Sequence, residues 1–269
     1  MPPLNKFICP VCGGALEKNG NSLVCKSGHL FDISAKGYVN LVTGGARRLS
    51  GDGKELIRAR ERVMALGYYR SLYALIGENF DFGSGDVILD VGTGDGSFAG
   101  KLKELFQAAD VIATDLAKHA IAHAAARYPG VAYAVANSAR LPVADSTLSA
   151  VTAVFTSVFP AEIRRVLKKG GLFIKVTPAA NHLLGLKKAL YDTVRTNVED
   201  ESVPEGFKKR STMYARDVYT ARGEGIKDLV EMTPYSVKTA PARLKALYPK
   251  DELKTETEFR VDVYEKDTK

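Results

Sequence analysis

Three cysteines and one histidine near the N-terminus have the spacing of a metal site. Cys9 and Cys12 are separated by two residues, and Cys25 and His29 follow after twelve more. Three thiolates and one imidazole can surround a single ion, and a closed set of this kind is typical of structural zinc, with no open position for substrate. The alternatives are three unrelated buried thiols and a histidine that only belongs to a turn; the odd cysteine count argues against disulfides. The spacing predicts structural Zn2+ bound by Cys9, Cys12, Cys25 and His29.

A glycine-rich loop with two carboxylates forms the second cluster. It follows Asp90 and reads Gly92-Thr93-Gly94-Asp95-Gly96. Such loops bind anionic dinucleotides in one large class of proteins, but here Ser97 replaces the final glycine of that motif, and two carboxylates would repel a pyrophosphate. S-adenosylmethionine instead carries a sulfonium and an ammonium group, which carboxylates attract. The loop therefore predicts an S-adenosylmethionine site formed by Asp90, Gly92, Gly94, Asp95 and Gly96.

Polar residues also end the next two expected strands. Asp115 ends the apolar segment 111–115, where we expect its carboxylate to accept hydrogen bonds from the ribose hydroxyls of the cofactor. The alternative is that Asp115 caps the helix expected over 118–128. Asn137 and Ser138 follow the segment 131–136, and we expect their polar groups to face the adenine.

Alternating strand and helix patterns must position these residues. Short apolar segments rich in β-branched residues alternate with helical periodicity for about 90 residues, which indicates an α/β fold. We expect a doubly wound, Rossmann-like sheet, in which the glycine loop joins the first strand to the first helix. The expected strands are 87–91, 111–115, 131–136, 150–155 and 172–177, and the expected helices are 97–106, 118–128 and 161–167.

Length and composition suggest one main domain with a small appendage. The 269 residues divide into a zinc-binding module (1–42), a linker with two helices (43–83) and a cofactor-binding domain (84–269). The two helices should break near Gly67. Toward the C-terminus we expect a helix over 186–194, a charged loop over 199–209 and a closing antiparallel strand over 256–264. A module of about 40 residues cannot bury enough apolar surface alone, so metal binding should supply much of its folding energy.

The charge of the chain is compatible with a polyanionic partner. The formal net charge is +7 and the pI is about 9.2. Basic residues cluster at Arg47-Arg48, Arg58 to Arg62, Lys168-Lys169, Lys187-Lys188 and Lys208 to Arg210. No apolar stretch approaches the roughly 20 residues of a membrane span, and no signal peptide is recognisable, so we expect a cytoplasmic protein without membrane contact.

In combination, these motifs resemble a known enzyme family. The loop around Asp90 resembles the first motif of class I methyltransferases. With the zinc pattern, it makes nearly the whole chain similar to bacterial 23S rRNA guanine-N1 methyltransferases. Further matching segments are Gly37 to Leu41, Gly51 to Gly53, Gly67 to Tyr69, Thr177-Pro178 with His182-Leu183, and Met232 to Pro234.

The resemblance implies methyl transfer to N1 of a guanine in a 23S rRNA hairpin loop, by a homodimer whose zinc modules help frame the RNA cleft. It also implies cofactor contacts from Tyr69, Gly94, Asp95 and His182. From the sequence alone, Tyr69 could equally be a packing aromatic, and His182 could cap the helix that follows it.

The acceptor side is where the chain departs from the family pattern. Residues 155–159, Phe-Thr-Ser-Val-Phe, replace a more polar segment with cysteine and proline in relatives. Phe155, Phe159 and Tyr191 are candidates for stacking on an unpaired base, and no general base can be named. Two other functions stay open at this point: methylation of a small molecule, and a non-enzymatic role in binding S-adenosylmethionine or a protein through the zinc module.

Overall fold

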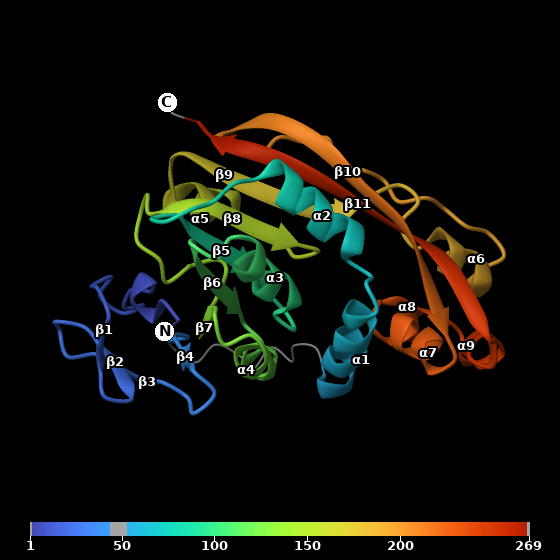
Figure 1. The fold of residues 1–269 in the computed structure, drawn as a ribbon, viewed down its shortest axis with the longest axis horizontal. Helices are drawn as coiled ribbons and strands as arrows, with labels where there is room; N and C mark the ends of the chain where they lie inside the picture. The colour runs from blue at the N-terminus through green and yellow to red at the C-terminus, as the bar shows by residue number, and fades with distance from the viewer. Residues whose placement is uncertain (1, 44–52, 268–269) are drawn as a thin grey trace.

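The computed structural model describes residues 2–43 and 53–267, and a mixed sheet forms its centre (Figure 1). Residues 44–52 of the expected linker, including Arg47 and Arg48, lie outside the described residues. The sheet order is β10-β11-β9-β8-β5-β6-β7-β4. None of the helices in the described ranges is both long and apolar enough to cross a membrane.

Five parallel strands form the doubly wound core and confirm the expected fold class. Four of them are short apolar segments that are almost completely buried, as expected when helices or other layers cover both faces, and the fifth, β9, is longer and partly exposed. The five strands are β5 (Val87–Val91), β6 (Asp110–Asp115), β7 (Ala132–Val135), β8 (Leu148–Val154) and β9 (Leu167–Pro178). The chain runs outward from β5 to β6 and β7, then returns to the other side of β5 with β8. This reversal makes the gap between β5 and β8 the switch point of the sheet.

Helices cover one face of this core. The first four α-helices of the described residues are α1 (Lys54–Ala65), α2 (Arg70–Asn79), α3 (Ser97–Leu105) and α4 (Lys118–Arg127). Buried side chains of α2, α3 and α4 pack on those of β5 and β6 that point to the same face. The expected helix break near Gly67 is present. On the opposite face lies α5 (Pro160–Val166).

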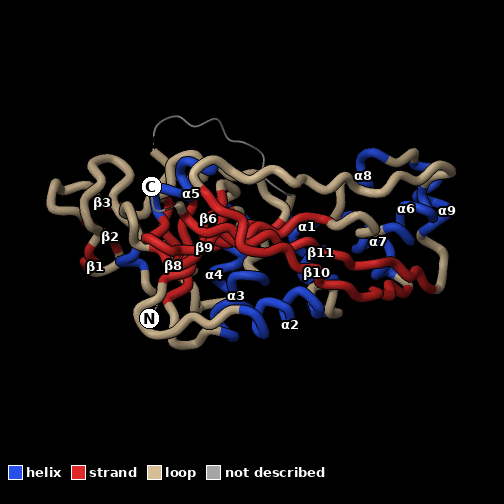
Figure 2. Tube along the Cα trace, turned by 90° about the horizontal axis from the view of Figure 1, so that it is seen from above, coloured by secondary structure: helices blue, strands red, loops and turns tan. Residues whose placement is uncertain are grey.

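A long antiparallel hairpin completes the other edge of the sheet. Its strands are β10 (Phe207–Arg222) and β11 (Glu252–Lys266), and β11 pairs with β9. Both strands run far beyond the core, and helices gather at their distant end (Figures 1 and 2). These are α6 (Leu184–Leu190), α7 (Glu224–Glu231), α8 (Tyr235–Lys238) and α9 (Pro241–Leu247). Strand β10 and helices α7 to α9 were not predicted. The strand expected over 256–264 is longer than expected, and α6 ends at Leu190 rather than Val194.

The N-terminal module packs directly against the sheet. A 3-10 turn, η1 (Leu4–Lys6), precedes a small antiparallel sheet of β1 (Glu17–Asn19), β2 (Ser22–Val24) and β3 (Leu30–Asp32). Strand β4 (Tyr38–Asn40) leaves the module and pairs in parallel with β7. This strand joins the module to the main sheet: β4 is the edge strand of that sheet, and its Val39 lies in one hydrophobic cluster with Cys9 and Cys25.

The N-terminal module covers a part of the sheet face where the connection between β7 and β8 provides no helix. Residues 136–147, which connect β7 to β8, contain no helix. The sheet face beside this connection is covered by the module, whose Leu4, Phe7, Leu16 and Leu23 belong to one hydrophobic cluster with Leu141 and Val143. The backbone amide of Ile8 donates to the carbonyl of Pro142 (2.9 Å). The module and the main sheet therefore share a core.

Candidate cofactor and zinc sites

The predicted cofactor residues converge on one edge of the sheet. Because β5, β6, β7 and β8 are parallel, their carboxyl ends lie on the same side. In open α/β sheets, ligands bind outside these ends at the switch point, here between β5 and β8. The glycine loop follows β5, Asp115 ends β6, Asn137 and Ser138 follow β7, and Phe155 follows β8.

The glycine loop is shaped by close packing as well as by backbone conformation. Gly92 has φ +68°, and a Cβ there would lie 2.4 Å from the hydroxyl oxygen of Thr156. Gly96 has φ +81°, and a Cβ there would lie 2.5 Å from the Cβ of Ala124. Any larger residue at these two positions would push the loop away from the helix and strand that support it. The loop is thus held closely against its neighbours, and the backbone amides of Gly92 and Thr93 donate to the carbonyl of Thr114 on β6 (2.8 and 3.1 Å).

Two buried carboxylates suit a cationic ligand. Oδ1 of Asp90 accepts a hydrogen bond from the hydroxyl of Thr152 (2.7 Å), and burial raises the pKa of Asp90 to about 7, with Asp115 and Asp95 adding to the rise. Oδ1 of Asp95 accepts from the hydroxyl and amide of Ser97 (2.9 and 3.3 Å). Its Oδ2 is buried and has no hydrogen-bond partner among the described residues. An ammonium or sulfonium group would relieve this concentration of negative charge and partner the free oxygen.

Asp115, the last residue of β6, links the loop after β5 to the segment after β6 through two hydrogen bonds. Its Oδ2 accepts a hydrogen bond from the amide of Gly94 (3.0 Å) and its Oδ1 from the amide of Ala117 (2.8 Å). Helix α4 begins at Lys118 and has no side-chain cap, so Asp115 does not cap it. Asn137 is exposed, and its Oδ1 accepts from the amide of Ala139 (2.9 Å). Contacts of these side chains with ribose and adenine stay predictions.

Tyr69, before α2, and His182, after β9, lie in one aromatic cluster near the carboxyl ends of β8 and β9. They belong to an aromatic cluster of Tyr68, Tyr69, Phe155, His182 and Phe259. Nε2 of His182 lies 3.0 Å from the hydroxyl oxygen of Tyr68, and its Nδ1 is buried without a hydrogen-bond partner among the described residues. Burial lowers the pKa of His182 to about 4, so the ring is neutral at physiological pH. His182 makes no capping hydrogen bond to α6. Contact of Tyr69 and His182 with the cofactor stays a prediction.

Three neighbours of the predicted residues were missed. Thr152 lies opposite Asp90 in the β5–β8 register, and its polar side chain within an apolar strand was a usable signal. Tyr68 is a buried partner of His182. Arg60 of α1 places Nη1 2.9 Å from where a Cβ of Gly94 would lie, and its positive charge opposes the burial that raises the pKa of Asp95. Nothing local in the sequence indicates that α1 reaches this site.

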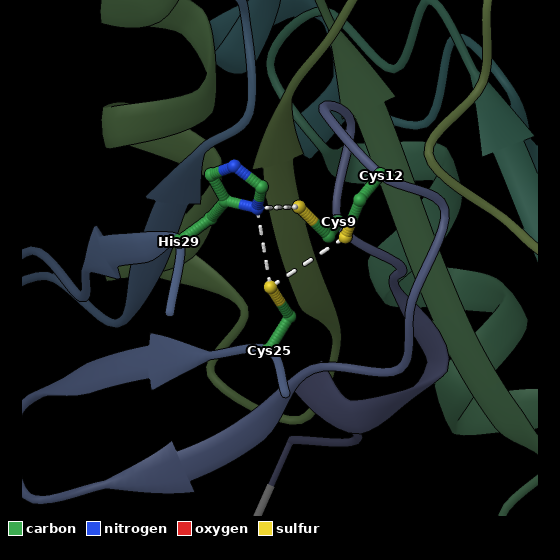
Figure 3. Close-up of side chains that lie close together, drawn as sticks. All are labelled: Cys9, Cys12, Cys25 and His29. Atoms are coloured by element: carbon green, nitrogen blue, oxygen red, sulfur yellow. Dashed lines mark hydrogen bonds between the residues drawn. The ribbon is translucent and has the colours of Figure 1, made fainter. Parts of the chain in front are cut away.

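The four predicted zinc ligands converge from two turns (Figure 3). Their ligand atoms all lie within 4.8 Å of one another. Cys25 Sγ is 3.3 Å from His29 Nδ1, and the Cys9 Sγ–His29 Nδ1 and Cys12 Sγ–Cys25 Sγ distances are both 3.6 Å. Tetrahedral zinc with ordinary bond lengths separates its ligands by about 3.5–3.8 Å, so the set fits this ion. The backbone amide of Gly14 and the side chain of Ser27 lower the pKa of Cys12 to about 6, which favours the thiolate that binds metal.

The acceptor loop, residues 155–159, borders the cofactor residues but differs from them in exposure. Phe155 and Phe159 are 43% and 49% exposed. Tyr191, the third stacking candidate, is the residue after α6. Its hydroxyl oxygen lies 2.8 Å from that of Thr239 and its ring contacts Tyr235, both at helix α8.

Two family models match the chain in the expected order. The zinc-ribbon model described as "RlmA, N-terminal" matches residues 7–43, and the model described as "Methyltransferase domain" matches residues 88–171. The first covers all four metal ligands, and the second covers the glycine loop and the carboxyl ends of β5 to β8. Structural zinc and an S-adenosylmethionine-dependent catalytic domain are therefore both supported.

Similar structures confirm the fold. A Haloferax volcanii methyltransferase solved with its activator Trm112 has a TM-score of 0.52 at 15% identity, and covers 78% of this chain and 94% of that one. The Haemonchus contortus phosphoethanolamine N-methyltransferase 2, solved with S-adenosyl-L-methionine, has a TM-score of 0.50 at 15% identity, and covers 94% of this chain and 71% of that one. At such low identity, these likenesses concern the fold alone.

Curated relatives extend over most of the chain. A Micromonospora griseorubida protein named for 23S rRNA guanine-N1 methylation is 32% identical over 88% of this chain and 89% of its own length. The similarly named YxjB of Bacillus subtilis is 31% identical over 90% of both chains. The 23S rRNA (guanine(748)-N(1))-methyltransferase of Streptomyces fradiae is 33% identical over 68% of this chain and 66% of its own length. The zinc ligands, the cofactor edge and these relatives together show that the chain belongs to the family of 23S rRNA (guanine-N1) methyltransferases.

Proposed function

We propose that this protein transfers a methyl group from S-adenosylmethionine to N1 of a guanine in 23S rRNA. The observation that carries the proposal is the pair of buried carboxylates, Asp90 and Asp95, beside a crowded glycine loop at the switch point. That arrangement selects a cationic donor over a dinucleotide. The names of the relatives supply the acceptor class, since the activity in those names is methylation of guanine N1 in 23S rRNA.

The protein's own residues hold the donor and leave its reactive group open to the acceptor. Asp90, Asp95 and Asp115 provide negative charge around the glycine loop, and Arg60 limits that charge from the side of α1. When bound, S-adenosylmethionine supplies a methyl group on a positively charged sulfur, and the electron pair of the broken carbon–sulfur bond returns to that sulfur. Guanine N1 forms the new bond to the methyl carbon, and its proton leaves to solvent. Alignment of acceptor and donor is the main catalytic task of the protein.

The acceptor guanine must be unpaired, because N1 lies on its Watson–Crick edge. We therefore propose a hairpin-loop guanine as the target and a homodimer as the working form, with the reaction in the cytoplasm, where ribosomal RNA is found. Several basic clusters take part in internal pairs: Lys168 pairs with Asp86, Lys187 is buried against Asn197, and Lys209 pairs with Asp262. Contacts to the RNA should therefore depend on only part of the positive charge.

Labelled methyl transfer tests this function. Ribosomal RNA from a strain that lacks the protein is incubated with the purified protein and labelled cofactor, and the RNA is digested to nucleosides. Label in 1-methylguanosine is the expected result. Label in another nucleoside, or label only in small molecules of a cell extract, would reject the proposed acceptor. No transfer to any acceptor by a cofactor-bound protein would favour the non-enzymatic role.

A further inference from the structure

Phe155, the first residue after β8, has an unusual backbone conformation. Its φ is +53°, a region that bulky residues almost never adopt without strain. Its amide donates a hydrogen bond to the carbonyl of Val176 on β9 (3.1 Å), which fixes the strained residue to the sheet. Strain of this kind persists where surrounding contacts hold it, and it concentrates at functional sites.

Three buried aromatic rings pack against the Phe155 side chain. Its ring centroid lies 5.4 Å from that of His182, 5.9 Å from that of Phe259 and 6.5 Å from that of Tyr69. These three side chains are buried, whereas Phe155 itself is 43% exposed. Phe155 is thus an exposed aromatic surface on a rigid base.

The position of Phe155 relates this surface to the methyl donor. It lies at the carboxyl end of β8, across the switch point from the glycine loop after β5. The next residue, Thr156, touches Gly92 so closely that a Cβ on that glycine would not fit. The exposed ring is thus one residue away from the wall of the predicted cofactor site.

We propose that Phe155 is a positioning residue on which the acceptor base stacks, so that the Watson–Crick edge faces the methyl group. This inference rests on the proposed function and names the side chain that orients its acceptor. Stacking on an aromatic side chain is the usual way in which proteins hold an unpaired base, and it leaves the hydrogen-bonding edge accessible. Phe159 has similar exposure but an ordinary backbone, with φ −107°.

The test uses four variants with 23S rRNA from a strain that lacks the protein. Phe155→Leu keeps apolar bulk without a flat ring, Phe155→Ala removes both, and Phe155→Tyr keeps the ring. Phe159→Ala reports on the other aromatic of the loop. The readouts are kcat and KM for formation of 1-methylguanosine, and the Kd for S-adenosylmethionine measured separately by calorimetry.

We expect Phe155→Leu and Phe155→Ala to reduce kcat/KM for RNA by about 10- to 100-fold, the range found for loss of one base-stacking contact. Phe155→Tyr should stay within about threefold of the wild type, since the ring is retained. The Kd for the cofactor should change little in Phe155→Leu, because this variant retains apolar packing on the buried rings.

Several results would overturn the proposal. They are a Leu variant as active as the wild type, a Tyr variant as poor as the Leu variant, a larger loss in Phe159→Ala, or a loss that parallels weaker cofactor binding. If the wild-type protein itself produces no 1-methylguanosine, the proposed function fails and the inference fails with it. Full wild-type activity with an unaffected Leu variant rejects only the role of Phe155.

Discussion

The predicted cofactor side and the acceptor side of the site, both at the carboxyl edge of the sheet, differ in how they are built. On the cofactor side, Asp90 and Asp95 are buried, and the glycine loop is in contact with α4 and the acceptor loop. On the acceptor side, Phe155 and Phe159 are 43% and 49% exposed. The predicted cofactor side is therefore packed against the protein, whereas the acceptor side presents aromatic surface to solvent. This difference explains why the donor can be inferred from local residues and the acceptor only from relatives.

The largest expected effect on activity comes from a substitution in the glycine loop. Gly92→Ala should abolish methyl transfer, because its new Cβ would overlap Thr156 and displace the glycine loop. Gly85→Ala is the matched control, since Gly85 also has positive φ (+88°) but has free space around its Cβ position. The control should lose about 1 kcal/mol of stability and keep its activity. Calorimetric cofactor binding and thermal unfolding measure both effects; equal losses in the two variants would show that strain alone is responsible.

The next largest effect should come from charge on the same side. Asp90→Asn should weaken S-adenosylmethionine binding by about 100-fold, because it removes a buried charge next to a cationic ligand. In the wild type, the cation requires the ionised carboxylate. Because the pKa of Asp90 is about 7 in the free protein, affinity should fall as pH drops from 8 to 6, and the variant should lack this dependence.

The stability of the cofactor-free protein should change with pH in the opposite direction. The folded-state pKa of Asp90 lies above the unfolded value of 3.8, so the folded protein retains a proton between about pH 4 and pH 7. The stability that this proton contributes is lost as pH rises through that window. Unfolding curves of wild type and Asp90→Asn at pH 5 and pH 8 test this, with the exposed carboxylate variant Asp145→Asn as control. Identical pH slopes in wild type and Asp90→Asn would show that burial does not perturb Asp90.

A zinc-ligand variant tests whether the N-terminal module contributes to stability and to substrate recognition. Cys12→Ser should reduce RNA methylation by about tenfold or more and lower the unfolding midpoint by about 5 °C or more, because zinc organises a module that shares a core with the sheet. Cofactor affinity should change much less at temperatures well below unfolding. Val11→Ser is the control, since Val11 is exposed in the same turn and binds no metal. Unchanged methylation after confirmed zinc loss would exclude the module from substrate recognition.

The smallest effect should come from one hydroxyl group beneath the acceptor loop. Tyr68→Phe removes the hydrogen bond with His182 and retains the packed ring, so stability should fall by about 1 kcal/mol. Methyl transfer should stay within about threefold of the wild type if the pair only supports Phe155. A loss of tenfold or more at unchanged stability would instead place the Tyr68–His182 pair in the reaction.

The comparison of the two sides also shows how far sequence can predict structure here. The strand at 87–91, its glycine loop and the convergence of the four cysteine and histidine side chains could be predicted because their signals are local: an apolar run, glycines and ligand spacing. Strand β10 was missed because its long segment mixes exposed and buried residues without a clear alternation and is stabilised by pairing with β11. Strand β4 pairs with β7, almost 100 residues away in the chain, and its three residues carry no signal of that contact. The approach of Arg60 to Gly94 in the glycine loop also joins residues far apart in the chain.

The most direct measurement is made on 23S rRNA from cells. A methyl group on guanine N1 blocks Watson–Crick pairing, so reverse transcription should stop next to the modified base. The stop should be absent in a strain that lacks the protein, return with the wild-type gene, and stay absent with Asp90→Asn. Loss of the stop together with loss of 1-methylguanosine from the digested RNA is the predicted result. A deletion strain with unchanged 1-methylguanosine, and wild-type protein that adds none to its unmethylated RNA, would contradict the account.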